Sequence, residues 1–391
     1  MRLDLCPMGF LDSLKTRDHD ILQTLIVKDP RMPDDPLTAS MNIENHVPGQ
    51  PKIKVLVTGA SGLLGSHIVE QWLATGADVR VILRSERPTP FLDLLGVTKV
   101  HGNLTDPIAC RFACEDVDYV CHAAAKVGDW GKWDEFQRDT IESTRQISEA
   151  ALHAKVKRFI HISSTSAYGH PDDRDTPINE THPLGQNIWR KDPYTLAKVE
   201  CERHLWKLSN AGLPLTVLRP SWLYGPRDRI TLARMVGNLK AGKMRLIGPG
   251  DNRISAIDAS EVARAVVLAA SQPVAEGQAY NITDLGEITQ FDFFGIMAEA
   301  AGLKRTTKTV NYPLAFYASV CMETWGRLVH PSRPPMLTRY AAWLMGRRLW
   351  YDNTKIRRDL GWVPVVDYPT SIRRAVEWYL KDSNLTAVTK R

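Results

Sequence analysis

Apolar and polar positions follow a regular rhythm from about residue 52 to residue 220. Short runs rich in Val, Ile and Leu, typical of strands buried on both faces, alternate with stretches whose apolar residues recur at helical spacing. The strands that this pattern predicts are residues 52–58, 78–83, 97–101, 117–123, 158–163 and 215–219. The helices that it predicts most clearly are residues 66–75, 135–153 and 194–209. The alternation indicates an α/β fold with a doubly wound parallel sheet, covered by helices on both faces.

After Pro220 the rhythm changes, because prolines, glycines and aromatic residues become frequent. A strand over residues 254–257, a helix over 259–270 and a strand over 279–282 return to the α/β pattern. We therefore expect residues 254–283 to rejoin the sheet domain of residues 51–220. The other parts expected are a poorly ordered extension over residues 1–50 and a smaller, mainly helical substrate-binding region over residues 221–391. In open α/β sheets the ligand crevice lies beyond the carboxyl ends of the strands.

A glycine-rich turn follows the first predicted strand. Gly59, Gly62 and Gly65 stand at three-residue spacing between this strand and the first predicted helix. Such a turn places bare backbone and the positive end of a helix against a diphosphate. Because the turn lies inside a strand–turn–helix unit, we predict a dinucleotide-binding Rossmann domain. A tight turn with only a structural role is the alternative.

The end of the second predicted strand favours NADP as the cofactor. In folds that prefer NAD, an acidic residue about 20 residues beyond the glycines binds the ribose hydroxyls. Arg84 stands at this place, and a guanidinium suits a 2′-phosphate. NAD remains the alternative, with Arg84 facing solvent.

Tyr194 and Lys198 are a candidate proton-transfer pair, because positions i and i+4 share one face of a helix. A nearby positive charge lowers the pKa of a phenol from about 10, which suits proton transfer near neutral pH. The same spacing recurs at Tyr351 and Lys355, so spacing alone does not decide between the pairs.

Hydroxyl side chains upstream of Tyr194 distinguish this pair from the pair Tyr351 and Lys355. Residues 162–169 read ISSTSAYG and place Ser164 at the end of a predicted strand. A hydroxyl beside a tyrosine can hold a substrate oxygen and stabilise the charge that develops on it. A strand-end turn cap is the alternative role for these serines. Tyr351 has no such partner nearby in the sequence, and we assign it to packing or to the surface.

Composition limits the remaining classes of function. The chain has 391 residues, 43% of them hydrophobic, and a net charge of +6 made of interspersed signs. It shows no nucleic-acid-binding motif, and its six cysteines make no zinc-ligand set, so we expect neither a nucleic acid nor a metal. Free thiols fit a reducing, cytoplasmic location. No uncharged apolar run approaches the roughly 20 residues of a membrane span.

Together these motifs resemble the extended short-chain dehydrogenase/reductase family, the NAD(P)-dependent epimerase/dehydratase group. The matching pieces are TGASGLLG at 58–65, GNLTD at 102–106, VCHAA at 120–124, the serine run with Tyr194 and Lys198, RP and YGPRD within 219–228, and KIRRDLGW at 355–362. The resemblance spans about residues 52–380. Within the family, AKVGDWGKW at 125–133 is similar to the 3β-hydroxysteroid and sterol dehydrogenase branch. Dihydroflavonol reductases and reductases of long-chain 3-oxoacids are near neighbours of that branch.

The resemblance implies a role for each candidate residue. Tyr194 would be the acid/base, Lys198 its electrostatic partner and a ribose ligand, and Ser164 the hydroxyl that positions the substrate oxygen, with Ser163 as second choice. The cofactor-binding set that it implies is Gly59, Ser61, Gly62, Leu63, Leu64, Gly65, Arg84, Asn103, Leu104, Ala123, Ala124, Ala125, Tyr194, Lys198 and Pro220.

Two further residues of this region have other expected roles. His122 lies in an apolar strand and is expected to be a hydrogen-bonded core histidine. Thr140 stands on the long predicted helix where the family commonly has Asn. Loss of this amide puts in doubt the usual packing of that helix near the active site.

The expected activity is reversible hydride transfer between a secondary alcohol and a ketone. Large apolar side chains expected near the crevice favour a steroid-like, sterol-like or long-chain 3-oxo substrate: Trp130, Trp133, Trp222 and Tyr224. A nucleotide-sugar epimerase or dehydratase, and a non-catalytic NADP sensor, are the alternatives.

Besides a small-molecule substrate, two further partners are considered: a membrane surface and a second copy of the chain. The basic and aromatic stretch 335–351 either touches a membrane surface or packs over the crevice, and apolar stripes at this spacing favour packing. The resemblance also suggests a homodimer.

Overall fold

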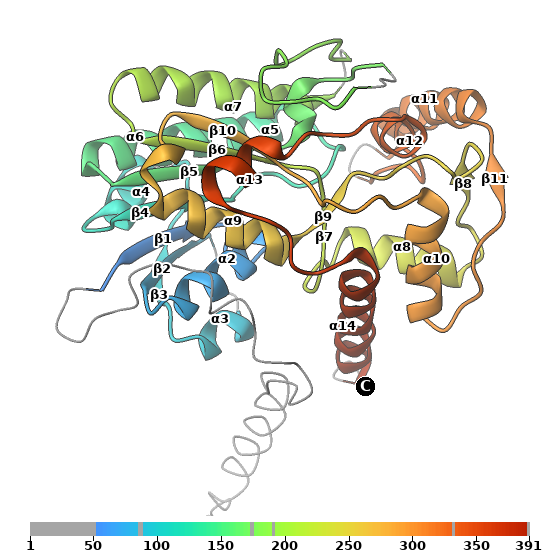
Figure 1. The fold of residues 1–391 in the computed structure, drawn as a ribbon, viewed down its shortest axis with the longest axis horizontal. Coiled ribbons are helices and arrows are strands. Elements are labelled where there is room, and N and C mark those ends of the chain that lie inside the picture. Colours follow the sequence, from blue (N-terminus) through green and yellow to red (C-terminus); the bar gives the residue numbers. More distant parts are fainter. Residues whose placement is uncertain (1–51, 85–88, 173–175, 190–191, 331–332, 389–391) are drawn as a thin grey trace, which may run out of the picture. The chain divides into compact units, whose positions relative to one another are not determined.

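A seven-stranded parallel sheet lies at the centre of the computed structural model, which describes residues 52–84, 89–172, 176–189, 192–330 and 333–388. The prediction made for residues 1–50 lies outside this described part. The strands are β1 (Lys54–Thr58), β2 (Asp78–Leu83), β3 (Thr98–His101), β4 (Tyr119–His122), β5 (Arg158–Ile162), β6 (Leu215–Pro220) and β10 (Gln278–Ile282). Their order is β10-β6-β5-β4-β1-β2-β3, as Figure 1 shows. The chain crosses to the other side of β1 at β4, which creates the switch point where open α/β sheets bind ligands.

Helices cover both faces of this sheet, so the predicted doubly wound α/β fold is confirmed (Figure 1). On one face α4 packs against α6 and α6 against α7; on the other α2 packs against α9. Their bounds are α2 (Leu63–Ala74), α3 (Pro90–Leu94), α4 (Pro107–Cys114), α6 (Ser143–Ala154), α7 (Pro193–Asn210) and α9 (Ala259–Ser271). Buried side chains between the sheet and the first of these layers include Leu56, Val120, Ile147, Phe159 and Leu215.

The long helix predicted over residues 135–153 is interrupted. It consists of α5 (Trp133–Phe136), a π-helix η1 (Gln137–Glu142) and α6. Thr140 lies in the π-helix, and its Oγ1 accepts a hydrogen bond from the Lys126 amide at 3.0 Å. The widened turn therefore joins this helix to the loop after β4, and single π-turns of this kind are frequent at functional sites.

The remaining elements form the C-terminal part, which has a core of its own that includes Val236, Phe293, Ile296 and Ile372. Its helices are α8 (Thr231–Lys240), α10 (Gln290–Ala300), α11 (Tyr312–Val329), α12 (Arg339–Gly346), α13 (Thr354–Leu360) and α14 (Tyr368–Val388). Two small parallel sheets join β7 (Trp222–Tyr224) to β9 (Ala256–Asp258) and β8 (Leu246–Ile247) to β11 (Thr309–Val310). The strand predicted at residues 254–257 thus forms β9, which pairs with β7 outside the main sheet.

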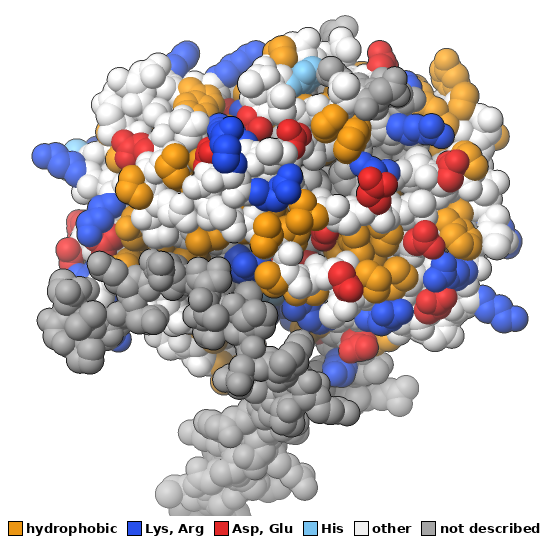
Figure 2. All heavy atoms as spheres, in the orientation of Figure 1, with side chains coloured by type: hydrophobic (Ala, Val, Ile, Leu, Met, Phe, Trp, Pro, Cys, Tyr) orange, Lys and Arg blue, Asp and Glu red, His pale blue; other side chains and the backbone are white. Residues whose placement is uncertain are grey.

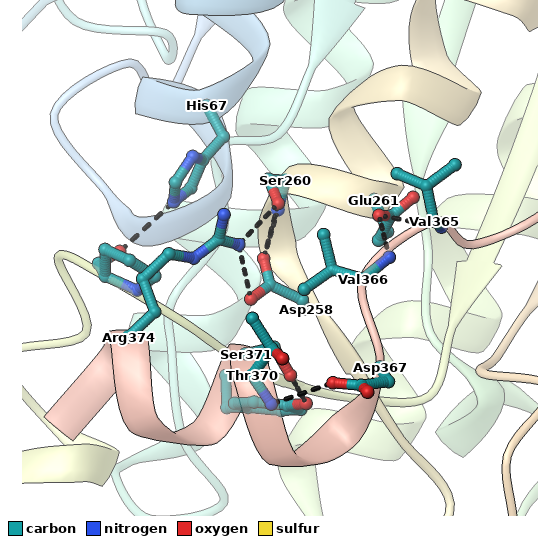
Figure 3. A network of polar contacts seen from close by, with 12 residues as sticks. His67, Asp258, Ser260, Glu261, Val365, Val366, Asp367, Thr370, Ser371 and Arg374 are labelled. Atoms are coloured by element: carbon teal, nitrogen blue, oxygen red, sulfur yellow. Dashed lines mark hydrogen bonds and ion pairs between the residues drawn. The ribbon is translucent and has the colours of Figure 1, made fainter. Parts of the chain in front are cut away.

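A buried polar network ties α9 to the segment that leads into α14 (Figure 3). Asp258 caps α9, and its Oδ2 accepts a hydrogen bond from Arg374 Nη2 at 2.9 Å. Glu261 Oε1 accepts from two backbone amides at 3.1 Å each, those of Val365 and Val366. This network fixes the C-terminal segment against the helix that covers the sheet.

The surface carries charges of both signs, interspersed over the face seen in Figure 2. Among the described residues, no helix combines the length and the apolar character that crossing a membrane requires.

Candidate active site

At the glycine turn after β1, the backbone comes close to the backbone that follows β4. Gly59 has φ +70°, and a Cβ at this position would lie 2.8 Å from the Ala124 nitrogen and 2.9 Å from the Ala123 carbonyl carbon. A Cβ on Gly65 would lie 2.1 Å from the Gly59 oxygen. Only glycine at these two positions lets the ends of β1 and β4 meet at the start of α2.

The N-terminus of α2 is open to a ligand. Gly62 is its N-cap, forms no side-chain capping hydrogen bond and is exposed, as is Ser61. The first turn carries no acidic side chain, while Leu63 is half-buried and Leu64 buried. The first amides of a helix have no intrahelical partner and attract anions. This cradle of bare backbone therefore fits the diphosphate of a dinucleotide.

Thr58 and His122 connect this turn to β4 and to the π-helix. Thr58 Oγ1 accepts from the Ala124 amide at 3.1 Å and lies 2.8 Å from His122 Nδ1. His122 Nε2 lies 3.0 Å from Thr144 Oγ1, whose hydroxyl donates to the Thr140 carbonyl at 2.7 Å. Burial lowers the pKa of His122 to about 3, so the ring is neutral. The predicted structural role of this histidine is confirmed.

Other residues predicted to bind the cofactor lie at the carboxyl ends of the strands. Arg84 ends β2 with a side chain 68% exposed, and its Nη1 lies 3.7 Å from Asp139 Oδ1 of the π-helix. Asn103 follows β3 and is exposed, and its Oδ1 accepts from the Thr105 amide. The remaining members are buried or half-buried: Leu104 after β3, Ala123, Ala124 and Ala125 after β4, and Pro220 at the end of β6.

Ser164, Tyr194 and Lys198 come together beside the end of β5. Lys198 is buried and its Nζ donates to the Ile162 carbonyl at 2.8 Å. Ser164 begins the 3-10 helix η2 (Thr165–Tyr168), where its Oγ accepts from the Ser166 amide at 3.1 Å. The Ser164 hydroxyl also lies near the phenol of Tyr194, in the first turn of α7, and opposes the rise in the pKa of this phenol. A candidate proton donor and a hydroxyl partner therefore share one site.

The pKa of Tyr194 is raised above its ordinary value, contrary to the expected lowering by Lys198. Burial is the main cause, the charges of Asp192 and Asp129 add to it, and the Ser164 hydroxyl opposes it. Burial also lowers the pKa of Lys198, whose ammonium group is directed at the Ile162 carbonyl. Tyr194 in this environment is a protonated phenol at neutral pH.

Residues 55–283 match the sequence profile of the NAD dependent epimerase/dehydratase family. The chain belongs to this family. It is the extended short-chain dehydrogenase/reductase family that the sequence motifs resemble, and the relatives in this comparison include reductases and dehydrogenases.

Two relatives and one solved structure are similar to this chain. The chain is 29% identical over 330 residues to a 2-alkyl-3-oxoalkanoate reductase of Stenotrophomonas maltophilia, covering 82% of this chain and 98% of the relative. It is 26% identical to a 3-beta-hydroxysteroid dehydrogenase of Mycolicibacterium neoaurum, covering 83% and 91%. The solved structure of UDP-glucuronic acid 4-epimerase from Bacillus cereus in complex with NAD superimposes with a TM-score of 0.66 at 22% identity, covering 84% and 99%. This last likeness concerns the fold alone.

Within the epimerase/dehydratase fold, the structure places residues around Tyr194 that sequence reasoning missed. The ring of Tyr340, from α12, meets Tyr194 edge-on at 6.2 Å. His170 stacks on Trp189 at 3.7 Å, and its Nε2 lies 2.9 Å from Asp192 Oδ2. The sequence signal for Asp192 is its place just before Pro193, typical of a helix N-cap; His170 and Tyr340 carry no such signal.

Two of the four aromatic residues expected near the crevice belong to β7 and pack in the C-terminal core. Tyr224 is buried there, and its hydroxyl is hydrogen-bonded to Ser371. Trp222 is half-buried and packs against Phe293 at 5.3 Å. Large aromatic residues serve in cores and in binding sites alike, so a place for these two rings near the crevice stays a prediction.

The other two aromatic residues precede the π-helix. Trp130 is buried under the guanidinium of Arg327, which lies 4.5 Å from the ring centroid. Trp133 begins α5 and is 38% exposed. Tyr351 is buried and stacks on Tyr168 at 6.0 Å, so its predicted packing role is confirmed.

Proposed function

We propose that the protein is an NADP-dependent oxidoreductase that interconverts a ketone and a secondary alcohol on a hydrophobic substrate. The observation that carries this proposal is the meeting of Ser164, Tyr194 and Lys198 at the sheet edge next to the glycine cradle. A bound nicotinamide dinucleotide would supply or accept the hydride. The protein's own groups then have to hold the carbonyl oxygen and deliver one proton.

Tyr194 is suited to give that proton in the reducing direction. Its raised pKa keeps the phenol protonated, and the Ser164 hydroxyl beside it can donate a hydrogen bond to the same substrate oxygen. Lys198 places a buried positive charge one helical turn along the same face of α7, where it favours negative charge on the reacting oxygens.

A hydrophobic substrate is supported by the aromatic side chains next to Tyr194. Tyr340 contacts Tyr194, and its ring also lies 5.9 Å from Trp343. Two relatives named above act, by their names, on 2-alkyl-3-oxoalkanoates and on 3-beta-hydroxysteroids. A substrate with a ketone or alcohol on a large apolar body fits both facts. The test is a panel of steroid and long-chain 3-oxo substrates, followed by NADPH and NADH oxidation.

NADP is proposed because Arg84 stands exposed at the end of β2. Replacing Arg84 by Ala should lower kcat/KM for NADPH by about tenfold and leave kcat/KM for NADH nearly unchanged, because only the 2′-phosphate loses its partner. Arg80→Ala is the matched control, since this arginine of β2 donates instead to the Ala113 carbonyl. An equal loss with both cofactors would contradict the assignment of Arg84.

A nucleotide-sugar epimerase is the second candidate, supported by the solved epimerase structure that shares the fold. An epimerase uses the hydride internally and retains its nicotinamide through turnover. The purified protein would then contain tightly bound NAD and would invert a nucleotide sugar without consuming added cofactor. A reductase shows the opposite result, with stoichiometric oxidation of NADPH.

A further inference from the structure

The outer face of α11 is an exposed apolar stripe. Its members recur at helical spacing along 15 residues and most are more than 60% exposed: Leu314, Tyr317, Cys321, Trp325 and Leu328. Figure 2 shows hydrophobic side chains projecting at the upper right edge, where Figure 1 draws α11. Soluble surfaces rarely keep so many large apolar side chains together on one helix face. The side chains on its inner face, by contrast, pack on α12 and the adjoining core.

The basic residues around this stripe indicate what covers it. Residues 301–351 contain eight Lys and Arg residues and one acidic residue, Glu323. Three of these arginines pair with acids outside the segment: Arg305 with Glu299, Arg347 with Asp172 and Arg348 with Asp251. Glu323 is buried and paired with Arg339 at 2.8 Å. Lys308 just before the helix and Arg333 just after it are exposed. Two copies of such a face would repel each other, whereas an anionic surface would attract it.

We propose that α11 docks this protein on an anionic membrane surface, lying in the plane of the headgroups with its stripe turned into the lipid. Trp and Tyr are favoured at this boundary because one end of each is apolar and the other polar, and Trp325 and Tyr317 stand on the stripe. The membrane-facing element is therefore α11 and not residues 335–351, whose helix α12 buries Ala342 and Trp343.

A cavity lies between this face and the aromatic residues that contact the candidate active site. It measures about 260 Å³ and lies under the start of α11, between Phe316, Trp189 and Trp343. Tyr317 lines it and is also 70% exposed, so the cavity reaches the surface at the stripe. Trp343 is in ring contact with Tyr340, which meets Tyr194. Entry of an apolar substrate from the lipid by this route rests on the proposed function; docking of α11 does not.

Vesicle co-sedimentation of the full chain tests the docking directly. The protein should bind phosphatidylcholine vesicles that contain phosphatidylglycerol, bind pure phosphatidylcholine much less, and lose binding as salt is raised. The double variant Trp325→Ser, Leu328→Ser should bind about tenfold more weakly or worse. Ile108→Ser, Phe112→Ser is the matched control, because these α4 side chains are 76% and 58% exposed at i, i+4 spacing. Wild-type binding by the α11 variant, or no binding by the native chain, would overturn the proposal.

Cys321 offers a second readout that does not depend on activity. It is exposed on the stripe, while Cys110, Cys114, Cys121 and Cys201 are buried. With Cys6 replaced by Ser, an environment-sensitive fluorophore on Cys321 should brighten on anionic vesicles. Size-exclusion chromatography tests whether a second copy of the chain covers this face instead. If the native protein is a dimer and the α11 double variant is a monomer, the face is an interface between copies and the proposal is overturned. Neither measurement changes if the proposed reaction is wrong.

Discussion

Two buried polar clusters of this protein differ in how their carboxylates are paired, although the first also contains two buried nitrogens without a hydrogen-bond partner, Arg264 Nε and Arg374 Nε. In the network of Figure 3, Asp258 accepts from the Ser260 amide at 2.8 Å, from the Ser260 hydroxyl at 2.7 Å and from Arg374 at 2.9 Å. Glu261 in the same network binds two backbone amides and an arginine. Each carboxylate here is saturated with donors, as a buried charge must be to stabilise a fold.

The carboxylate of Asp192, in the cluster around Tyr194, accepts fewer hydrogen bonds. Its Oδ1 accepts from the Thr195 amide at 3.0 Å, its Oδ2 lies 2.9 Å from His170 Nε2, and Thr195 Oγ1 is buried without a partner. Burial and two carboxylates meanwhile raise the pKa of Tyr194. Unpaired polar atoms and a shifted pKa are costly to keep in a core and collect where chemistry occurs. Under the proposed function, the first cluster serves stability and the second serves reactivity.

The largest expected effect comes from Tyr194→Phe. The variant keeps the ring contact with Tyr340 but loses the proton, so kcat for ketone reduction should fall by about 10²- to 10⁴-fold with little change in Tm. Cofactor binding, followed by fluorescence of the reduced nicotinamide, should stay near the native value. Tyr351→Phe is the control, since it alters the second Tyr-x-x-x-Lys pair and should retain most activity. Comparable activity in the two variants would remove the catalytic assignment.

Asp258→Ala, in the network of Figure 3, is expected to lower stability and to leave kcat unchanged. Loss of the α9 cap and of the Arg374 ion pair should lower the free energy of unfolding by about 2–4 kcal/mol. The folded fraction should keep the native kcat at low temperature. Asp367→Ala is the matched control, because this exposed residue caps only the start of α14 through the Thr370 amide and should cost about 0.5–1 kcal/mol. Thermal and urea unfolding measure both variants, and equal losses would contradict the special role of Asp258.

The sequence predicts the helix that carries the first cluster and the reactive pair in the second, but not the residues packed around that pair. Local periodicity and short motifs, which need only neighbours along the chain, predict the strands, the glycine turn, the core position of His122 and the pair Tyr194 and Lys198. They do not predict the π-helix, because its widened turn depends on a contact between Thr140 and the Lys126 amide.

The residues around Tyr194 and the direction of its pKa shift could not be predicted, because both depend on contacts between distant segments. His170, Asp192 and Tyr340 come from three segments, and only the folded chain brings α12 over the start of α7. The pKa of Tyr194 was mispredicted for the same reason: the burial and the carboxylates that raise it are supplied by tertiary structure. Local pattern thus identifies the reactive groups, while their electrostatic surroundings appear only in three dimensions.

The smallest effect, and the sharpest test of the comparison, concerns the pH dependence of the reaction. Asp192→Asn keeps an N-cap for α7 but removes a negative charge that raises the pKa of Tyr194. Because a raised pKa holds the phenol protonated to higher pH, reduction should persist beyond the ordinary tyrosine pKa in the native enzyme and decline at lower pH in the variant. The alkaline limb of the kcat/KM profile should therefore move towards neutrality, with kcat on the plateau changed only a few-fold.

Asp251→Asn provides the control for that profile, because its side chain is 63% exposed and faces only Arg348 at 4.0 Å. If the alkaline limb of the kcat/KM profile stays in place in Asp192→Asn, then Asp192 acts on the geometry of the helix alone. A limb that moves with Asp192, and not with Asp251, shows that the incompletely paired cluster sets the proton affinity of Tyr194. In that case Asp192 acts on the phenol through its charge, and its contact with His170 at 2.9 Å is part of the electrostatic surroundings of the site.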